Sequence, residues 1–455
     1  MTKEVLILYT KESSLDKVKY VFDFIFGLPF NIYQINIKYE NVKNHDPKSK
    51  KDIIINYSNQ KVENATIQIS DTDIPNFIKS YKDFLSISSQ AYTFENKILY
   101  GLVKNKPSES ENQTEESFIN GTVINLDIVS TFFVHLSRIE EFYCPDDLKD
   151  QHKRMIARHQ FLVKNSLERI PVLDHISVAF LKRINFYEPI QTKKIMSHDI
   201  DVLLKFPNLY KYVRGAARIL FKKKSFKGSL FTFTKHYFRS YLGKKDPYQT
   251  FSWLFNPNFF DKKMVFFMAG GTTKYDNLYD IEDASLKNVF QNALSNNYEI
   301  GLHPSYAAYN DENQFLKEKK KLEKVTQKEI TSSRQHILHY DVIKTPNVLE
   351  VSGIQNDYTI GYQDRIGFRS GTGFEYYLWN NLENKMFFIK ETPLVIMDGC
   401  LLIEAEYSVK KAKEIHDLFF QDNNLNTQIT YNFHNSIFDP VLLDSCALKQ
   451  FYLEL

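Results

Sequence analysis

The stretch that decides the fold of this chain is KIMSHDIDVL, at residues 194–203. An apolar run with a β-branched residue enters a cluster of acidic and imidazole groups, which is typical of a buried strand with polar side chains at its carboxyl end. Side chains alternate between the faces of a strand, so Asp199 and Asp201 are predicted to point the same way and His198 oppositely. Two carboxylates in one small volume favour a bound cation. The alternative is a helix-capping Asp followed by a solvent-facing Asp.

After Pro189, short apolar runs alternate with helical stretches. The runs predicted as strands cover residues 195–199, 264–268, 298–303, 330–334, 367–369, 394–397 and 429–434. Helices are predicted over residues 284–295, 313–328 and 409–423. This alternation predicts an α/β fold with a parallel sheet, and seven units favour a closed or nearly closed barrel over an open sheet. Active residues are then expected at the carboxyl ends of the strands.

The first part of the chain carries no clustered chemistry. At 455 residues the chain exceeds one average domain, and we expect a smaller α/β domain at residues 1–188 before the barrel at residues 189–455. Strands are predicted at residues 5–8, 32–37, 52–57 and 83–87, a polar loop at 104–117, and helices that pack back on this domain across 127–183. Its histidines, His135, His152, His159 and His175, are interpreted as structural or surface residues.

The composition excludes some classes of partner. The net charge is +3, from 58 basic and 55 acidic residues, so the whole chain is not built for nucleic acid. Three cysteines without metal-type spacing fit a reducing compartment. The first apolar run is too short for the core of a signal peptide, and no window reaches the roughly 18 apolar residues that a membrane-spanning helix needs. We therefore expect a cytoplasmic protein.

One segment departs from this balance. Residues 205–245 hold twelve Lys or Arg, no acid and interleaved aromatic residues, which reads as an insertion into the barrel. Such a segment suits peripheral attachment to an anionic membrane surface, here the inner face, or contact with a phosphate-bearing substrate. A solvated pair of helices covering the barrel explains it as well.

Polar side chains recur where the predicted strands end. The residues concerned are His303, Arg334 with His336, Arg369, Asp398 and His434, in addition to the acidic pair of the first strand. A single histidine in such a place is more often a satisfied core residue. Recurrence at six strand ends indicates one shared site instead.

Residues 189–455 resemble the polysaccharide deacetylases of carbohydrate esterase family 4, the NodB-homology domain. SHDID at 197–201 is similar to the first motif of that family, EIGLH at 299–303 to the lead-in of the second, the helix and strand ending at Arg334 to the third, and Phe433-His434 to the last. The resemblance implies a distorted (β/α)7 barrel that removes N- or O-acetyl groups from sugars with a divalent metal, commonly zinc. The whole chain is similar to a bacterial subgroup with an extra N-terminal domain.

The resemblance also implies a role for each matching residue. Asp199 takes the place of the catalytic base, and Asp201 and His303 take the places of metal ligands. Arg334 takes the place of the arginine that holds the base. His434 takes the place of the general acid.

The chain departs from the family at the second metal histidine, whose place holds Ala307. His336 is proposed as the replacement, because three protein ligands plus water form the usual catalytic zinc site. His198 is a weaker candidate because strand parity turns it away. Arg369 and Asp398 are predicted to bind substrate, although a structural ion pair explains Arg369 equally well.

These residues predict a metal-dependent hydrolase that removes N- or O-acetyl groups from a polysaccharide or a lipid-linked sugar intermediate. The first alternative is a catalytically impaired, deacetylase-like barrel that serves as a carbohydrate-binding or scaffolding protein, which Ala307 favours. The second is a metal-dependent C–N hydrolase acting on a small non-sugar amide. Metal content separates the first alternative from an enzyme.

Overall fold

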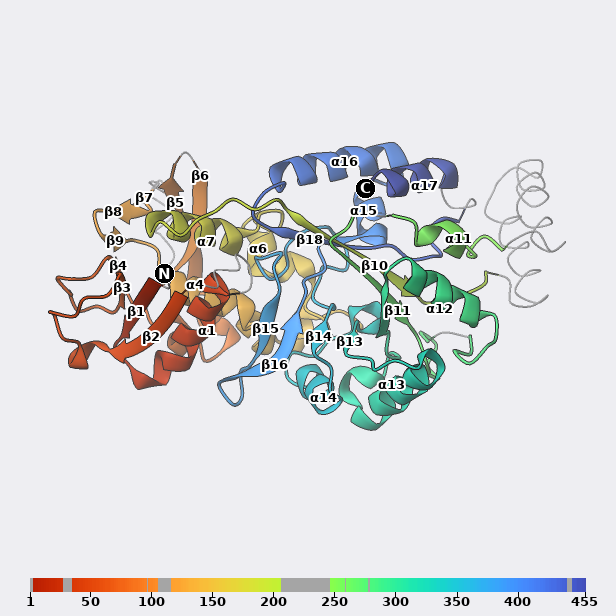
Figure 1. Cartoon of the computed structure of the whole chain (residues 1–455), viewed down its shortest axis with the longest axis horizontal. Coiled ribbons are helices and arrows are strands. Elements are labelled where there is room, and N and C mark those ends of the chain that lie inside the picture. The colour runs from red at the N-terminus through yellow and green to blue at the C-terminus, as the bar shows by residue number, and fades with distance from the viewer. Residues whose placement is uncertain are drawn as a thin grey trace.

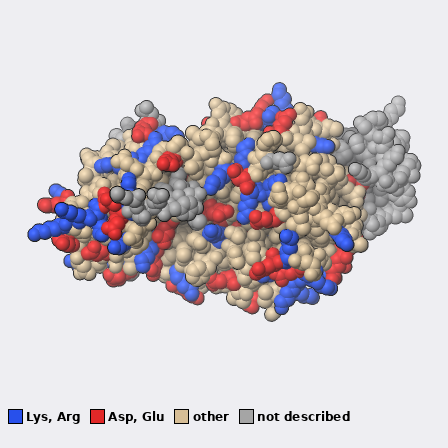
Figure 2. Space-filling model, in the orientation of Figure 1, with Lys and Arg blue, Asp and Glu red and all other residues tan. Residues whose placement is uncertain are grey.

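The structure is a computed structural model that describes residues 3–27, 35–95, 97–104, 116–205, 246–257, 259–276, 279–439 and 444–455. The basic insertion predicted at 205–245 lies outside the described residues except for Lys205, as does most of the polar loop predicted at 104–117. Within the described ranges, no helix combines the length and the apolar character needed to cross a membrane. On the face shown in Figure 2, basic and acidic side chains are interspersed, in line with the small net charge.

The N-terminal part of the chain is built on a six-stranded sheet with the order β2-β1-β3-β4-β9-β8. Its strands are β1 (Lys3–Tyr9), β2 (Ile35–Asn41), β3 (Ile53–Tyr57), β4 (Ile67–Ile69), β8 (Ile119–Asn120) and β9 (Val123–Ile124). All neighbours are parallel except β8 and β9. The predicted strands at 5–8 and 52–57 are confirmed, and the described part of 32–37 lies in β2.

The strand predicted at 83–87 is wrong over most of its length. Residues Tyr81–Phe84 form the short helix α3, which begins because the hydroxyl of Ser80 accepts a hydrogen bond from the backbone N–H of Asp83. The strand β5 (Ile87–Phe94) starts only at the last residue of the predicted range. It pairs with β6 (Lys97–Lys104) and β7 (Glu116–Ser117) in a three-stranded sheet.

Helices accompany these sheets, and the last four of them lie in the range 127–183, where helices are predicted. They are α1 (Leu15–Phe26), α2 (Ile74–Phe77), α4 (Ile128–Leu136), α5 (Ile139–Phe142), α6 (Phe161–Lys164) and α7 (Val172–Arg183). Asp127 begins α4 by accepting a hydrogen bond from the N–H of Ser130. α4 packs on α1 and β6, and α7 packs on β6.

The second part of the chain is built on a nine-stranded sheet with the order β15-β16-β14-β13-β12-β11-β10-β18-β17. Its strands are β10 (Lys193–Ile200), β11 (Lys262–Phe267), β12 (Glu299–Leu302), β13 (Ser332–Ser333), β14 (Asn356–Asp357), β15 (Tyr376–Asn380), β16 (Lys385–Glu391), β17 (Ile396–Met397) and β18 (Gln428–Asn432). All neighbours are parallel except β15 and β16. The predicted parallel sheet is thus confirmed.

The strand predicted at 367–369 is wrong. The backbone N–H of Phe368 donates to the carbonyl of Glu168, from the N-terminal part of the chain, instead of to a neighbouring strand. Gly371 then donates to the carbonyl of Phe368 and closes a turn. Gly367 has φ of 144°, which an L side chain rarely adopts, so this glycine allows the bend.

The segment at 385–397 contacts both halves of the large sheet. β16 pairs with β14, and the same segment continues into β17, which pairs with β18. Between them Leu394 bridges Gly361, and the N–H of Val395 donates to the carbonyl of Thr430. Backbone hydrogen bonds therefore connect the β14 side to the β18 side through this one segment.

Helices alternate with the strands of the large sheet, as predicted (Figure 1). They are α11 (Phe251–Leu254), α12 (Leu286–Ser295), α13 (Glu312–Thr326), α14 (Thr345–Val351), α15 (Asp398–Glu404), α16 (Val409–Asp422) and α17 (Ser445–Glu454). The predictions at 284–295, 313–328 and 409–423 are confirmed within two residues at each end.

The two parts of the chain share one hydrophobic core. The ring of Trp379, on β15, lies 5.0 Å from that of Tyr20 on α1 and 5.1 Å from that of Phe133 on α4. The hydroxyl of Tyr20 donates to the carbonyl of Tyr377 at 2.6 Å. Side chains therefore pack closely across the predicted domain boundary between residues 188 and 189. The division of the chain into two domains stays a prediction.

Candidate metal centre and active site

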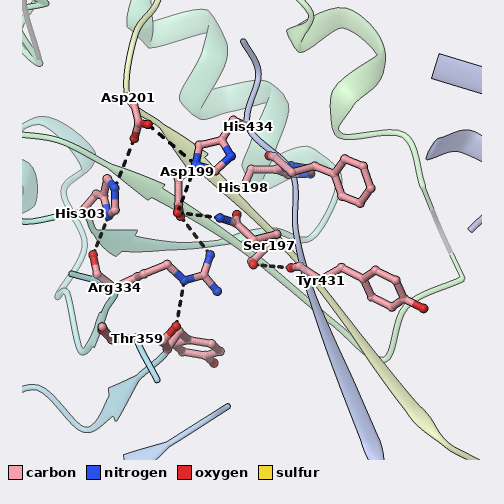
Figure 3. Close-up of polar contacts among 12 residues, drawn as sticks. Ser197, His198, Asp199, Asp201, His303, Arg334, Thr359, Tyr431 and His434 are labelled. Carbon is pink, nitrogen blue, oxygen red and sulfur yellow. Dashed lines mark hydrogen bonds and ion pairs between the residues drawn. The ribbon is translucent and has the colours of Figure 1, made fainter. Parts of the chain in front are cut away.

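Five of the predicted site residues meet beyond the carboxyl ends of four parallel strands (Figure 3). Asp199 and Asp201 lie at the end of β10, His303 follows β12, Arg334 follows β13 and His434 follows β18. Parallel strands present their carboxyl ends at one edge, so residues far apart in sequence converge there. These five residues, which the sequence pattern singled out, therefore lie together at one edge of the sheet.

Asp199 is held in place by two donors. Its Oδ1 accepts a hydrogen bond from Arg334 Nη1 at 3.0 Å, and its Oδ2 accepts one from Asn432 Nδ2 at 2.7 Å. Burial raises the pKa of Asp199, but the charges of Arg334, His303 and His434 outweigh this effect and hold the pKa below its usual range. Asp199 is thus an oriented, ionised carboxylate.

Arg334 is itself held by further contacts, although its Nη2 is buried without a hydrogen-bond partner. It is fully buried, its Nε donates to the carbonyl of Tyr358 at 2.9 Å, and its guanidinium lies 4.7 Å from the ring centre of Phe266. A buried guanidinium keeps its charge, so its contact with Asp199 is a permanent ion pair.

Asp201 and His303 face each other across a gap that suits a cation. His303 Nδ1 lies 2.5 Å from the carbonyl of Arg334, which can only accept, so this nitrogen carries the proton. Burial lowers the pKa of His303, but without a metal Asp199 and Asp201 outweigh this effect and raise the pKa, which favours a proton on Nε2. In the neutral form this atom is an acceptor, 3.2 Å from Oδ1 of Asp201, another acceptor. Two lone pairs face each other unless a proton or a metal ion lies between them.

His336 completes this group. One possible ligand atom from each of Asp201, His303 and His336 lies within 4.8 Å of the others. The rings of His303 and His336 are 5.0 Å apart, and His336 Nδ1 is buried without a hydrogen-bond partner, 3.9 Å from Oδ1 of Asp276. One carboxylate and two imidazoles form a set that zinc uses at catalytic sites with an open position. The residues present therefore fit a divalent metal.

Neither Ala307, which stands where the family has its second metal histidine, nor His198, the other candidate for the third ligand, lies in this group. Ala307 is exposed, before a short turn at Ala308–Asn310. His198 is fully buried on the opposite side of β10, as strand parity predicts, with Nδ1 2.7 Å from the carbonyl of Phe433 and Nε2 3.2 Å from the hydroxyl of Tyr452. His198 is a satisfied core residue.

His434 lies on the other side of the two aspartates. Its Nε2 is 3.8 Å from a carboxylate oxygen of Asp199 and 3.8 Å from one of Asp201. Burial lowers the pKa of His434, but Asp398, with further contributions from Asp201 and Asp199, outweighs this and raises the pKa to about 10. His434 is thus a protonated imidazolium at neutral pH.

The position of Asp398 corrects the expectation that it binds substrate. Asp398 is 1% exposed and begins α15. One oxygen accepts from the backbone N–H of His434 at 2.7 Å, and the other lies 2.9 Å from its Nδ1. Both oxygens are occupied by His434, so Asp398 orients that imidazole instead.

For Arg369, the structure favours the alternative of a structural ion pair over substrate binding. The arginine is buried, its Nε and Nη2 donate to Oε1 of Glu141 at 3.1 and 2.8 Å, and its Nη1 donates to the carbonyl of Gly361 at 2.7 Å. Glu141 also pairs with Arg138. The guanidinium joins the N-terminal part of the chain to the large sheet, and Arg369 is not among the residues that line the cavity described below.

A cavity of about 250 Å³ opens over the three candidate metal ligands and the two proton-transfer candidates. Besides the five residues Asp199, Asp201, His303, His336 and His434, it is lined by Arg154, Gln335 and Gln363 and by apolar side chains. Neither amide atom of Gln335 has a hydrogen-bond partner, although the residue is 1% exposed. A buried amide without a partner is costly, so this side chain is suited to a ligand or water.

Sequence reasoning missed several of these residues. Asn432 lies two positions before His434 at the end of the same strand, and the strand period of two was a usable signal for its orientation. Gln335 is next to the predicted His336. Arg154 had no signal, because it comes from the N-terminal part of the chain and reaches the cavity only through tertiary packing.

Comparisons with known proteins found a family model and several solved structures that are similar to this chain. A family of unknown function, DUF7033, matches residues 6–189. No curated protein matches the chain. A structure of a putative polysaccharide deacetylase from Mycobacterium smegmatis is 13% identical over 59% of this chain and 85% of that one, with a TM-score of 0.32.

Two further solved structures are similar at the same level. A polysaccharide deacetylase from Bacillus cereus is 11% identical over 58% of this chain and 86% of its own, with a TM-score of 0.26. A pseudoenzyme of carbohydrate esterase family 4 from Bacillus anthracis is 9% identical over 60% and 66%, with a TM-score of 0.24. Likeness this low assigns no activity, so the function has to follow from the site itself.

Proposed function

We propose that this chain is a metal-dependent hydrolase that removes an N- or O-acetyl group from a carbohydrate. The observation that supports it best is the position of the ionised carboxylate of Asp199 beside the group of Asp201, His303 and His336, with His434 opposite. A fixed base, a set of ligands that fits a metal and a protonated imidazole are the parts that hydrolysis of an amide or ester requires.

Each of these residues has a defined task in that reaction. A divalent ion such as zinc, held by Asp201, His303 and His336, would polarise the acyl carbonyl and lower the pKa of water. Asp199 takes the proton of the attacking water, and Arg334 and Asn432 keep its carboxylate ionised and oriented. His434 carries a proton at neutral pH and gives it to the departing nitrogen or oxygen of the sugar.

The fold that we propose for residues 189–455 is a distorted (β/α)7 barrel. It is supported by the continuous segment at 385–397, which bonds to β14 at one end and to β18 at the other. Residues 1–188 form the proposed N-terminal domain, and the family match over residues 6–189 supports that boundary. The basic residues at 205–245 are proposed to contact an anionic membrane, which salt-sensitive binding to anionic vesicles would test.

The chain also supports a second candidate, a C–N hydrolase for a small amide. The cavity of about 250 Å³ lies below the ~300–1,000 Å³ of typical ligand pockets, so it admits an acyl group more readily than several sugar rings. A binding or scaffolding protein without metal is the third candidate, which Ala307 favours. Turnover of acetylated oligosaccharides against small amides separates the first two, and metal content separates both from the third.

The test is metal content and deacetylation measured on the same preparations. The purified chain should bind about one equivalent of zinc, which three protein ligands with an open position predict. Asp201→Ala and His303→Ala should both lose it, whereas His159→Ala, a histidine outside the site, should keep it. Full metal retention in both ligand variants would exclude this centre. Absence of turnover on any acylated sugar with zinc supplied would favour the binding-protein alternative.

A further inference from the structure

The turn that carries His336 has an unusual backbone. Ile337 has φ of 59° and ψ of 19°, and Leu338 has φ of 51°, while the N–H of His339 donates to the carbonyl of His336 at 3.1 Å. Two successive left-handed residues inside such a hydrogen bond form a turn that normally contains Asn and Gly. A β-branched Ile in this conformation is strained. Backbone strain persists only where surrounding structure holds it.

A side chain from the N-terminal part of the chain holds this turn. Arg154 is 9% exposed, and its Nη1 donates to the carbonyl of Ile337. Its Nε and Nη2 donate to Oδ2 of Asp150 at 2.9 and 2.7 Å, which fixes the guanidinium. Arg154 also lines the cavity beside His336. It therefore contacts the strained peptide directly, one residue from the proposed ligand.

The loop around Arg154 contacts the other ligand-bearing segment as well. The loop spans residues 149–155, which are closed by a bridge between Lys149 and Met155. His152 Nδ1 lies 3.1 Å from the hydroxyl of Tyr306, three residues after His303. Tyr306 in turn accepts at its carbonyl from His339 Nδ1 at 3.0 Å. The loop thus packs over the segments that follow both β12 and β13.

We propose that Arg154 is a positioning residue for the metal centre: it holds the strained turn at 336–339 so that His336 faces Asp201 and His303. This inference rests on the proposed metal site. It gives the N-terminal part of the chain a task at the site, because Arg154 lies within the segment that matches the family of unknown function. It also explains how a ligand after β13 replaces the one absent at Ala307.

An alternative reading is that Arg154 only stabilises the fold through its ion pair with Asp150. The two readings differ in what happens when His336 is already absent. A residue that acts through His336 has no further effect on metal binding in a His336→Ala protein, because effects transmitted through one group are not additive. A residue that stabilises the fold generally lowers metal affinity in both backgrounds.

The experiment measures zinc affinity by competition with a chelating dye, in the full chain, with the melting temperature of the metal-free protein beside it. Arg154→Ala should weaken zinc binding by about 10–100-fold, the range for partners that orient metal ligands. In the His336→Ala background the same substitution should change affinity by less than about twofold. Arg169→Ala, which breaks an exposed ion pair with Glu404, is the matched control and should not change affinity.

A second variant tests the strain directly. Ile337→Gly removes the β-branched side chain from the left-handed position, so in the Arg154→Ala background it should recover most of the lost affinity. Two results would overturn the inference while leaving the metal site intact. One is a zinc affinity of Arg154→Ala within about twofold of wild type, and the other is an equal loss of zinc affinity with and without His336. A wild-type chain that binds no zinc would overturn the proposed function and this inference together.

Discussion

Two of the buried arginine–carboxylate pairs among the described residues, Arg334–Asp199 and Arg369–Glu141, differ in that only the first belongs to the candidate active site. Arg334 pairs with Asp199 at 3.0 Å, and Arg369 pairs with Glu141 at 2.8 Å. The side chains of the two arginines are 0% and 6% exposed. Both were predicted as site residues because each follows an apolar run. Burial and ion pairing therefore do not distinguish them.

The surroundings of the two carboxylates do distinguish them. Asp199 has one oxygen on Arg334, while the other accepts from Asn432 and lies near the imidazole of His434. Glu141 accepts from Arg369 and also from Arg138, away from the cavity. One carboxylate is thus presented to a cavity by its arginine, and the other is enclosed between two arginines. The first arrangement supports chemistry, whereas the second joins two parts of the fold.

The largest loss of turnover is expected from Asp199→Asn, in the pair that belongs to the candidate active site. The amide keeps the shape of the side chain but cannot take a proton, so turnover should fall by at least about 10²–10⁴-fold, the usual contribution of a general base. Metal content should stay close to wild type, whereas the melting temperature should fall because the buried charge of Arg334 loses its carboxylate partner, so turnover is compared per folded molecule. The matched control is Glu141→Gln, which should keep turnover per folded molecule. Activity of Asp199→Asn within about threefold of wild type would remove Asp199 from the proposed role.

Arg369→Ala should produce a different pattern. It removes one of the two charge partners of Glu141, which keeps Arg138, so the free energy of unfolding should fall, by less than the ~3–5 kcal/mol expected for a charge left wholly unpaired. Turnover per folded molecule should not change, because Arg369 does not line the cavity. Denaturant unfolding at neutral pH measures the first quantity and steady-state kinetics the second. A clear loss of turnover without loss of stability would return Arg369 to the site.

The pair of Arg369 and Glu141 also predicts how the stability of the fold depends on pH. Burial raises the pKa of Glu141, but the charges of Arg138 and Arg369 outweigh this and lower it to about 2. A carboxyl whose pKa is depressed by folding contributes stability that is present above its unfolded pKa of about 4.3 and is lost as pH falls through the folded value. The difference in unfolding free energy between wild type and Glu141→Gln should therefore shrink between about pH 4 and pH 2. A constant difference across that range would contradict the assignment.

Asp398→Asn is expected to have an intermediate effect on turnover at the site of Arg334 and Asp199. After the opposing effect of burial, Asp398 is the main cause that raises the pKa of His434 to about 10. A general acid works while it is protonated, so a lower pKa moves the alkaline limit of activity to lower pH. The pH profile of kcat/KM should show that shift, with a modest loss of kcat at neutral pH. An unchanged profile would mean that Asp398 does not act through His434.

The sequence predicted the location of this site better than the contacts within it. The strand period of two placed Asp199 and Asp201 on one side of β10 and His198 on the other, because that property depends only on local backbone geometry. The partner of a charged side chain depends on tertiary packing. Asp398 and Arg369 were accordingly given substrate contacts, whereas the structure pairs them with His434 and Glu141.

The fold shows the same division between local and distant information. Long, apolar β10, β11 and β18 were predicted, but the two-residue β14 and the hairpin of β15 and β16 were not. Very short strands carry too few residues for a period to be detected. The turn at 367–369 was read as a strand because its apolar content resembles one, although its backbone bonds to Glu168, about 200 residues earlier.

Whereas Glu141 pairs with two arginines, the second partner of Asp199 is the neutral Asn432. Its amide donates to the oxygen of Asp199 that Arg334 leaves free, at 2.7 Å. Asn432→Ala removes one hydrogen bond to a charged group, worth about 1.5–3 kcal/mol, so kcat should fall by roughly 10–100-fold at constant metal content. Asn432→Asp should be worse than Asn432→Ala, since a second carboxylate against Asp199 repels it or raises its pKa. If both variants kept full kcat, Arg334 alone would be sufficient to orient the base.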